Sequence, residues 1–131
     1  MNPLAPAVQV DVVDDNLVVR MRGLDMLVAF RRTLRIPADH VRGVVVQPRD
    51  RLPQIGFYFP GIAVPGVLVA GAFGFGDDRS FWHVRRAELL LRVECHPGAE
   101  FRRLVLQVPD PTALAGRLRP RLGSYVPPES V

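Results

Sequence analysis

Alternation of apolar and polar residues along much of the chain is the feature that most constrains its fold. Residues 8–12 alternate valine with Gln or Asp, and residues 17–21 repeat the pattern after the polar segment 14–16. A period of two residues is typical of strands with one buried face. Asp and Asn tolerate the backbone geometry of tight turns. These residues therefore predict a β-hairpin.

Further segments with the pattern of short strands follow along the chain. The sequence predicts them at residues 32–36, 42–47, 67–75, 79–85, 89–95 and 101–108. Residues 24–30 have the spacing of one or two helical turns, and residues 49–66 are predicted to be a long connection. A loop of that length is uncommon and often functional. The chain is thus expected to contain seven or eight short antiparallel strands.

The C-terminal part carries the clearest helical pattern. Asp110 is a favourable N-cap, and Pro111 is a favourable first helical residue. Leucines recur every four residues at positions 114, 118 and 122, so they share one face of the helix. Pro120 lacks an amide hydrogen and clashes with the preceding turn. The regular helix is therefore expected to end near Arg119, and residues 123–131 are expected to form a flexible tail.

Composition limits the classes of function. A chain of 131 residues, 48% hydrophobic and 23% charged, suits one globular domain. The net charge is +4, and all 17 basic residues are Arg. Such exclusive use of Arg is typical of the coding bias of a GC-rich bacterial genome. Nucleic acid is not expected as a partner, because its binding requires basic residues clustered on one face.

Cysteine content and apolar segments indicate a cytoplasmic location. The single cysteine, Cys95, excludes an intramolecular disulfide and fits a reducing compartment. Residues 1–11 lack the basic region and the apolar core of a signal peptide. Residues 55–75 approach the length of a membrane span, but Pro60, Pro65 and several glycines interrupt them.

The order of the elements resembles the pleckstrin-homology-like (PH-like) superfold, and most closely the small PH-like domains of uncharacterised actinobacterial proteins. The segments that carry the resemblance are LRIPADHVRGVVV, PGIAVPGVLVAGAF, RSFWHVRR and FRRLVLQVPDPTALAGRLRPRL. The resemblance implies a partially open antiparallel β-barrel of about seven strands over residues 8–122, after an N-terminal arm of residues 1–7. A C-terminal helix over about residues 110–119, or to residue 122, would cap one end of the barrel.

The same resemblance implies binding rather than catalysis, because PH-like domains dock lipids, peptides or other subunits, and some bacterial versions form rings. The phosphoinositide motif of the eukaryotic domains is only half matched. Arg20 and Arg22 fit its second strand, but the first strand has no basic residue. Asp14 and Asp15 in the intervening turn would repel phosphate. Specific binding of a phosphoinositide headgroup is therefore not expected.

Residues 79–85 belong to a candidate anion or ligand site. Alternation places residues 80, 82 and 84 on one face of a strand and residues 81, 83 and 85 on the other. In the functional interpretation, an Arg-rich edge contains Arg20, Arg22, Arg79, Trp82, His83 and Arg85. In the structural interpretation, Trp82 or Phe81 fills the core while Arg and His side chains cover its rim. The sequence favours the structural interpretation.

The segment 55–66 is too apolar for a solvated connection. Its large apolar residues define a candidate interaction surface, which comprises Phe57, Tyr58, Phe59 and Ile62. Two interpretations stay open: the segment folds back as a lid on the core, or it contacts a second copy, a peptide or a membrane.

The sequence predicts no catalytic, metal or cofactor site. Alternation with Leu91 and Val93 indicates that Cys95 is an inert core thiol. One Cys and three His lack the spacing of a structural zinc site. The chain is therefore expected to be a non-enzymatic interaction domain that docks a protein partner or self-assembles. The alternative is a peripheral binder of anionic lipid, or of another anionic or hydrophobic small ligand, through the Arg-rich edge.

Overall fold

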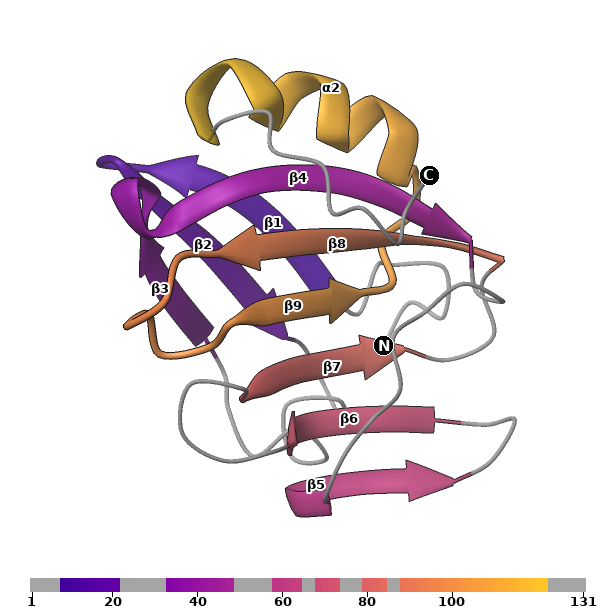
Figure 1. Cartoon of the computed structure of the whole chain (residues 1–131). Coiled ribbons are helices and arrows are strands. Elements are labelled where there is room, and N and C mark those ends of the chain that lie inside the picture. The colour runs from indigo at the N-terminus through magenta and orange to yellow at the C-terminus, as the bar shows by residue number, and fades with distance from the viewer. Residues whose placement is uncertain are drawn as a thin grey trace.

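The computed structural model describes residues 8–21, 33–48, 58–64, 68–73, 79–84 and 88–122, which form two β-sheets and one α-helix (Figure 1). The predicted mainly-β class is confirmed. The first sheet has the order β1-β2-β3 and consists of β1 (Val8–Val13), β2 (Asn16–Met21) and β3 (Thr33–Pro37).

The second sheet contains six strands in the order β4-β8-β9-β7-β6-β5. The short 3₁₀ helix η1 (Ala38–His40) leads into it from β3. Its strands are β4 (Val41–Pro48), β5 (Tyr58–Val64), β6 (Leu68–Phe73), β7 (Ser80–Val84), β8 (Leu89–Cys95) and β9 (Arg103–Leu106). The α-helix, α2 (Pro111–Leu122), follows β9.

The predicted N-terminal hairpin is confirmed. β1 pairs antiparallel with β2, and a two-residue turn joins Val13 to Asn16. Both turn residues, Asp14 and Asp15, have positive φ values of 51° and 60°. This combination matches the twist of the flanking strands and suits Asp better than most side chains. The Asn16 side-chain amide also donates to the Asp14 carbonyl at 3.0 Å.

The strand arrangement differs from the prediction of about seven antiparallel strands. The described residues form nine strands, because residues 58–64 of the predicted long connection are β5. In addition, β7 and β9 are parallel. β8 runs antiparallel to β7 but one strand away, and β9 fills the gap between them. Because β9 is antiparallel to β8, it must be parallel to β7.

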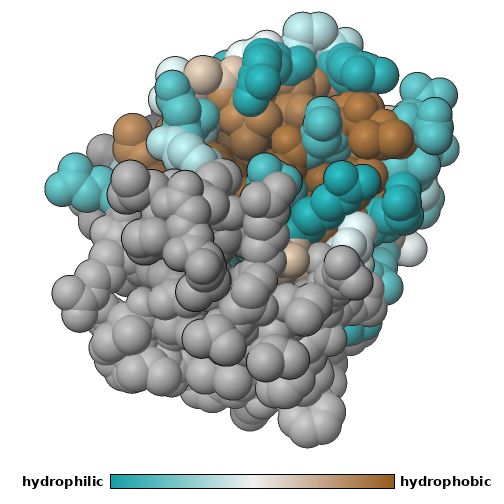
Figure 2. Space-filling model, turned by 180° about the vertical axis from the view of Figure 1, so that it is seen from behind, coloured by the Kyte–Doolittle hydropathy of each residue, from teal (hydrophilic) through white to brown (hydrophobic). Residues whose placement is uncertain are grey.

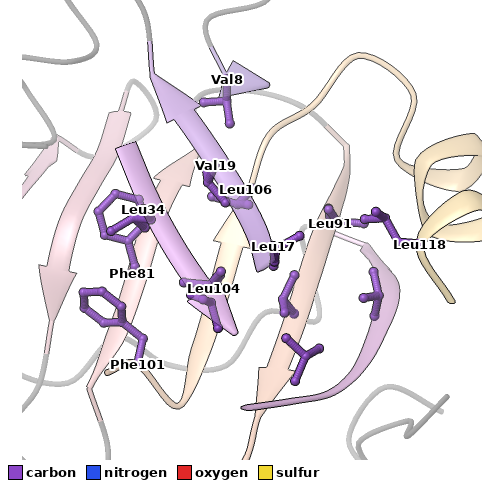
Figure 3. Packing of buried hydrophobic residues seen from close by; sticks show 14 of the residues in the cluster. Val8, Leu17, Val19, Leu34, Phe81, Leu91, Phe101, Leu104, Leu106 and Leu118 are labelled. Atoms are coloured by element: carbon purple, nitrogen blue, oxygen red, sulfur yellow. The ribbon is translucent and has the colours of Figure 1, made fainter. Parts of the chain in front are cut away.

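The two sheets pack face to face around the main hydrophobic core. Val19 and Leu34 of the first sheet, Phe81 and Leu106 of the second, and Leu118 of α2 belong to the same cluster of buried residues. Figure 3 shows these side chains in the layer between the sheets, with Leu118 at its helix side. Full burial of such side chains contributes about 1.5–3 kcal/mol each, so this layer dominates the stability.

A second cluster occupies the opposite face of the six-stranded sheet. It contains Phe73, Trp82, Val84, Leu90 and Val105. Phe81 and Trp82 are neighbours on β7 and therefore point to opposite faces, and both are at most 2% exposed. The six-stranded sheet is thus buried on both faces in its described central part.

Helix α2 lies across β4 and β8 with its leucines buried (Figure 1). The Asp110 carboxylate accepts a hydrogen bond from the Ala113 amide at 3.1 Å, which confirms the predicted N-cap. The prediction that the helix ends near Arg119 was wrong, because it continues through Pro120 to Leu122. Pro120 cannot donate to the Gly116 carbonyl, but both residues are exposed, so water can hydrate that carbonyl. Burial of Leu122 stabilises the last turn.

Several predictions fall outside the described residues: the arm 1–7, the helical turns 24–30 and the tail 123–131. Within the described part of the chain, no helix has both the length and the apolar character needed to cross a membrane.

Candidate functional site

The structure does not bring together the described residues of the predicted Arg-rich edge. Trp82 and His83 point to opposite faces of the six-stranded sheet, and each is only 2% exposed. Trp82 Nε1 donates to Ser80 Oγ at 2.9 Å, so its one polar group is used inside the fold. Arg20 lies on β2 in the other sheet. Arg22 and Arg85 are outside the described residues.

Arg79 acts at the surface of the core instead. Its guanidinium carbon lies 4.9 Å from the ring centroid of Phe101. That ring packs at 5.5 Å, centroid to centroid, against Phe81. An Arg over an aromatic face is stabilised by the ring quadrupole, so the described contacts of Arg79 match the predicted role of a cover over the core.

The predicted interaction surface lies on or next to β5. Tyr58, Phe59 and Ile62 belong to this strand, which is at the end of the six-stranded sheet among the described strands. Phe57 is outside the described residues. The choice between a lid and an interface therefore stays a prediction.

A pocket lies where the first sheet meets the beginning of α2. Its volume is about 270 Å³. The described residues that line it are 8–11 of β1, Val18 and Arg20 of β2, Val108 and Pro109 before the helix, and Leu114 and Arg117 of α2. Successive residues of a strand point to opposite faces. A cavity lined by four consecutive residues therefore runs along the edge of β1.

Among the described residues, no strand pairs with the outer edge of β1. The residue pair that flanks a two-residue turn is hydrogen-bonded, and bonded and non-bonded pairs then alternate. Since Val13 pairs with Asn16, the backbone groups of Val8, Val10 and Val12 point away from β2. The Val12 amide donates to Asp11 Oδ1 at 2.9 Å. Among the described strands, β1 pairs only with β2.

Two cations and one anion border the pocket. Arg20 and Arg117 are both exposed, and neither takes part in the ion pairs found between described residues. The Asp11 carboxylate is occupied at one oxygen by the Val12 amide. The pocket therefore combines an excess of positive charge with apolar walls from valine and leucine side chains.

No family model, curated protein or solved structure matches the chain. The geometry of the described residues therefore has to support any functional assignment.

A buried polar cluster on the second face of the six-stranded sheet was missed by sequence reasoning. Arg92, which is 0% exposed, donates through Nε to Glu94 Oε1 and through Nη1 to Gln47 Oε1, the latter at 3.0 Å. Arg103 Nε reaches the same Glu94 oxygen at 3.3 Å. Charges at alternate positions of β8 are the usual signal of a solvent-facing side. Here that side is covered, so the cluster is a structural element rather than an accessible site.

Cys95 is an inert thiol, as the sequence indicated. The side chain is fully buried in the main core. Burial raises the pKa of the thiol to about 12, and the nearby Glu94 carboxylate adds to the shift. The thiolate is the reactive form of cysteine. A nucleophilic role for Cys95 therefore has no support in the folded state.

This burial makes a measurable prediction. Ellman's reagent at pH 8 is expected to label Cys95 only through unfolding, so the rate of labelling should rise to that of a free thiol in denaturant. Rapid labelling without denaturant would contradict the buried placement.

The raised pKa of Cys95 also determines how the stability of the fold changes with pH. Above the ordinary pKa of 9.0, the unfolded thiol ionises while the folded one stays protonated, so stability falls as pH increases from 9 toward 12.

Among the described residues, no group of three or more His, Cys, Asp or Glu side chains is placed to hold a metal ion.

Proposed function

We propose that the chain is a non-enzymatic binding domain that docks a partner protein at the pocket along β1. This proposal rests on three features that lie in one place. They are an edge of β1 that no described strand occupies, apolar walls and two exposed arginines. Edge strands readily accept an added chain through backbone hydrogen bonds.

We also propose that the fold is a PH-like variant. Two sheets that pack face to face, with a C-terminal helix over one side of the core, support this proposal. The nine described strands and the parallel β7–β9 pair are its departures from the expected pattern. A PH-like scaffold is compatible with docking, but the pocket alone supplies the argument for where docking occurs.

The position of the pocket at a strand edge favours a segment of a larger partner over a free small molecule. Its volume of about 270 Å³ lies just below the usual range of about 300–1,000 Å³ for pockets that enclose a drug-sized ligand. It therefore accommodates a few residues of a chain whose remaining contacts lie outside it.

Site-specific cross-linking tests the proposal. The photoreactive residue benzoylphenylalanine is placed at Gln9, which is exposed at the pocket. Irradiation of the cells in which the protein naturally occurs is expected to give one cross-linked product of discrete, higher mass. The matched control carries the same residue at Glu100, which is exposed but does not line the pocket. Reversal of the pocket charges with Arg20→Glu and Arg117→Glu should abolish the adduct.

Three results would contradict this assignment. The first is the same adduct from position 100, the second is no adduct from position 9, and the third is an adduct of twice the chain mass, which identifies a second copy as the occupant.

The exposed arginines also favour a second candidate, a peripheral binder of anionic lipid. Arg20 and Arg117 would contact headgroups, and such binding weakens as salt screens the charges. Co-sedimentation with phosphatidylcholine vesicles, with and without phosphatidylserine, distinguishes the two candidates. Salt-sensitive binding that requires phosphatidylserine supports the lipid candidate, and its absence removes it.

A further inference from the structure

The edge of β1 determines how a docked segment would lie. Val8 and Val10 direct their backbone groups away from β2 and line the pocket. The Val12 amide is already bonded to its neighbour Asp11, which ends the available edge on that side. A chain in the pocket can therefore hydrogen-bond to the backbone around Val10 but cannot extend the pairing freely past Val12. The segment that fits is short and extended.

The two sides of that segment would contact residues of different polarity. A strand added beside β1 presents its side chains alternately to the same two faces as β1. On the core side, Val8 and Val10 face the main cluster, and Leu114 of α2 completes an apolar wall. On the outer side, β1 carries Gln9, which lies directly opposite Arg20 of β2. One side of the segment must therefore be apolar and the other polar.

The charges at the pocket favour acidic residues on the polar side of the docked segment. Arg20 and Arg117 border the pocket with two positive charges, against the one negative charge of Asp11. Arg makes directional, charge-assisted hydrogen bonds to carboxylates. A basic side chain in the segment would be repelled by both guanidinium groups, and a neutral one would leave them without an anionic partner in the complex. Figure 2 shows the side of the molecule behind Figure 1, where hydrophobic residues gather and hydrophilic residues interrupt and border them.

We propose that the pocket along β1 binds a short extended segment of a partner protein in which acidic residues alternate with apolar ones. The segment adds to β1 through backbone hydrogen bonds at Val10, and its carboxylates pair with Arg20 and Arg117. The apolar residues pack against Val8, Val10 and Leu114. This inference rests on the proposed function and specifies the chemistry of the partner.

Fluorescence polarisation with synthetic peptides tests the inference. The probe is a fluorescein-labelled, end-blocked peptide of alternating valine and glutamate. We expect it to bind at least about fivefold more tightly than the same peptide with glutamine in place of glutamate, given the usual strength of partly exposed ion pairs. The lysine version should not bind.

Variants of the protein locate the contact. Arg20→Ala and Arg117→Ala should each weaken binding of the glutamate peptide about threefold to fivefold, and should leave the glutamine peptide unaffected. The matched controls are Arg35→Ala on β3 and Arg121→Ala on α2, which remove exposed arginines that do not line the pocket. These controls should bind the probe as the unmodified protein does.

Backbone methylation tests strand addition. N-methylation of alternate residues removes the amide hydrogens on one edge of the peptide. One methylation register should abolish binding, while the other should preserve it, because only one edge of the peptide faces β1. Equal binding of both registers would overturn strand addition, and equal binding of the glutamate and glutamine peptides would overturn the acidic specificity.

The peptide and cross-linking results separate this inference from the proposed function. A discrete adduct at position 9 with no binding of the glutamate peptide overturns the inference that the docked segment is acidic, and it leaves the docking proposal standing. Failure of both experiments overturns both.

Discussion

Replacement of Glu94 with leucine is expected to lower the free energy of unfolding by about 3–5 kcal/mol. Glu94 supplies the carboxylate that accepts hydrogen bonds from both Arg92 and Arg103. Arg92 is 0% exposed, so its guanidinium cannot recover hydration when the carboxylate is removed. Gln47, whose Oε1 also accepts from Arg92 at 3.0 Å, carries no charge and cannot replace the carboxylate. Loss of a carboxylate that pairs with a buried cation is among the larger single penalties a fold can carry.

Equilibrium denaturation in urea measures this change, and Glu88→Gln is the matched control. Glu88 is exposed beside the start of β8, so its change should stay within about 0.5 kcal/mol. The double variant Arg92→Leu with Glu94→Leu should recover most of the loss, because a buried ion pair can often be replaced by apolar residues without cost. Arg103 would then turn outward, since its side chain is already 21% exposed. A change below about 1 kcal/mol for Glu94→Leu alone would contradict the buried cation.

The sequence predicted the elements whose signals are local. The β1–β2 hairpin follows from alternation around a turn of two Asp residues, and the start of α2 follows from Asp110 as N-cap. Both signals concern residues that interact with near neighbours in the chain. The prediction that the helix ends near Arg119 failed because burial of Leu122, a tertiary interaction, outweighs the local penalty of Pro120.

The arrangement of the strands could not be predicted in the same way. The parallel pairing of β7 with β9 depends on which strand fills the gap left between β7 and β8, and no residue of β9 encodes that choice locally. The buried cluster around Arg92 has the same cause. Alternating charges in β8 indicate a solvent-facing side unless the position of the rest of the chain is known.

The two arginines of the candidate pocket could not be placed together from the sequence. Arg20 was predicted as part of an anion site, but with partners on β7 that the structure places elsewhere. Its actual neighbour at the pocket, Arg117, is almost a hundred positions further along the chain. Only the packing of α2 against the core brings the two arginines to one site. The position of α2 therefore matters for both stability and binding.

Replacement of Leu118 with alanine is expected to lower the free energy of unfolding by about 2–5 kcal/mol. Leu118 is 4% exposed, and Figure 3 shows it directed from α2 into the core beside Leu91. Truncation removes apolar contacts and leaves a cavity that the rigid sheet can only partly close. Arg117→Ala, one residue earlier on the exposed side of the helix, should change stability by less than about 0.5 kcal/mol.

Thermal and urea denaturation of the two variants, together with binding of the glutamate peptide, distinguish the two roles of α2. Arg117→Ala should weaken binding in a stable protein, because it removes a charge but leaves the helix in place. Leu118→Ala should destabilise the fold but, under conditions where it remains folded, should still prefer glutamate over glutamine, because both arginines remain. If Leu118→Ala proved as stable as the unmodified protein, the helix would not be anchored by its buried leucines. The pocket wall that it forms would then have to be held in another way.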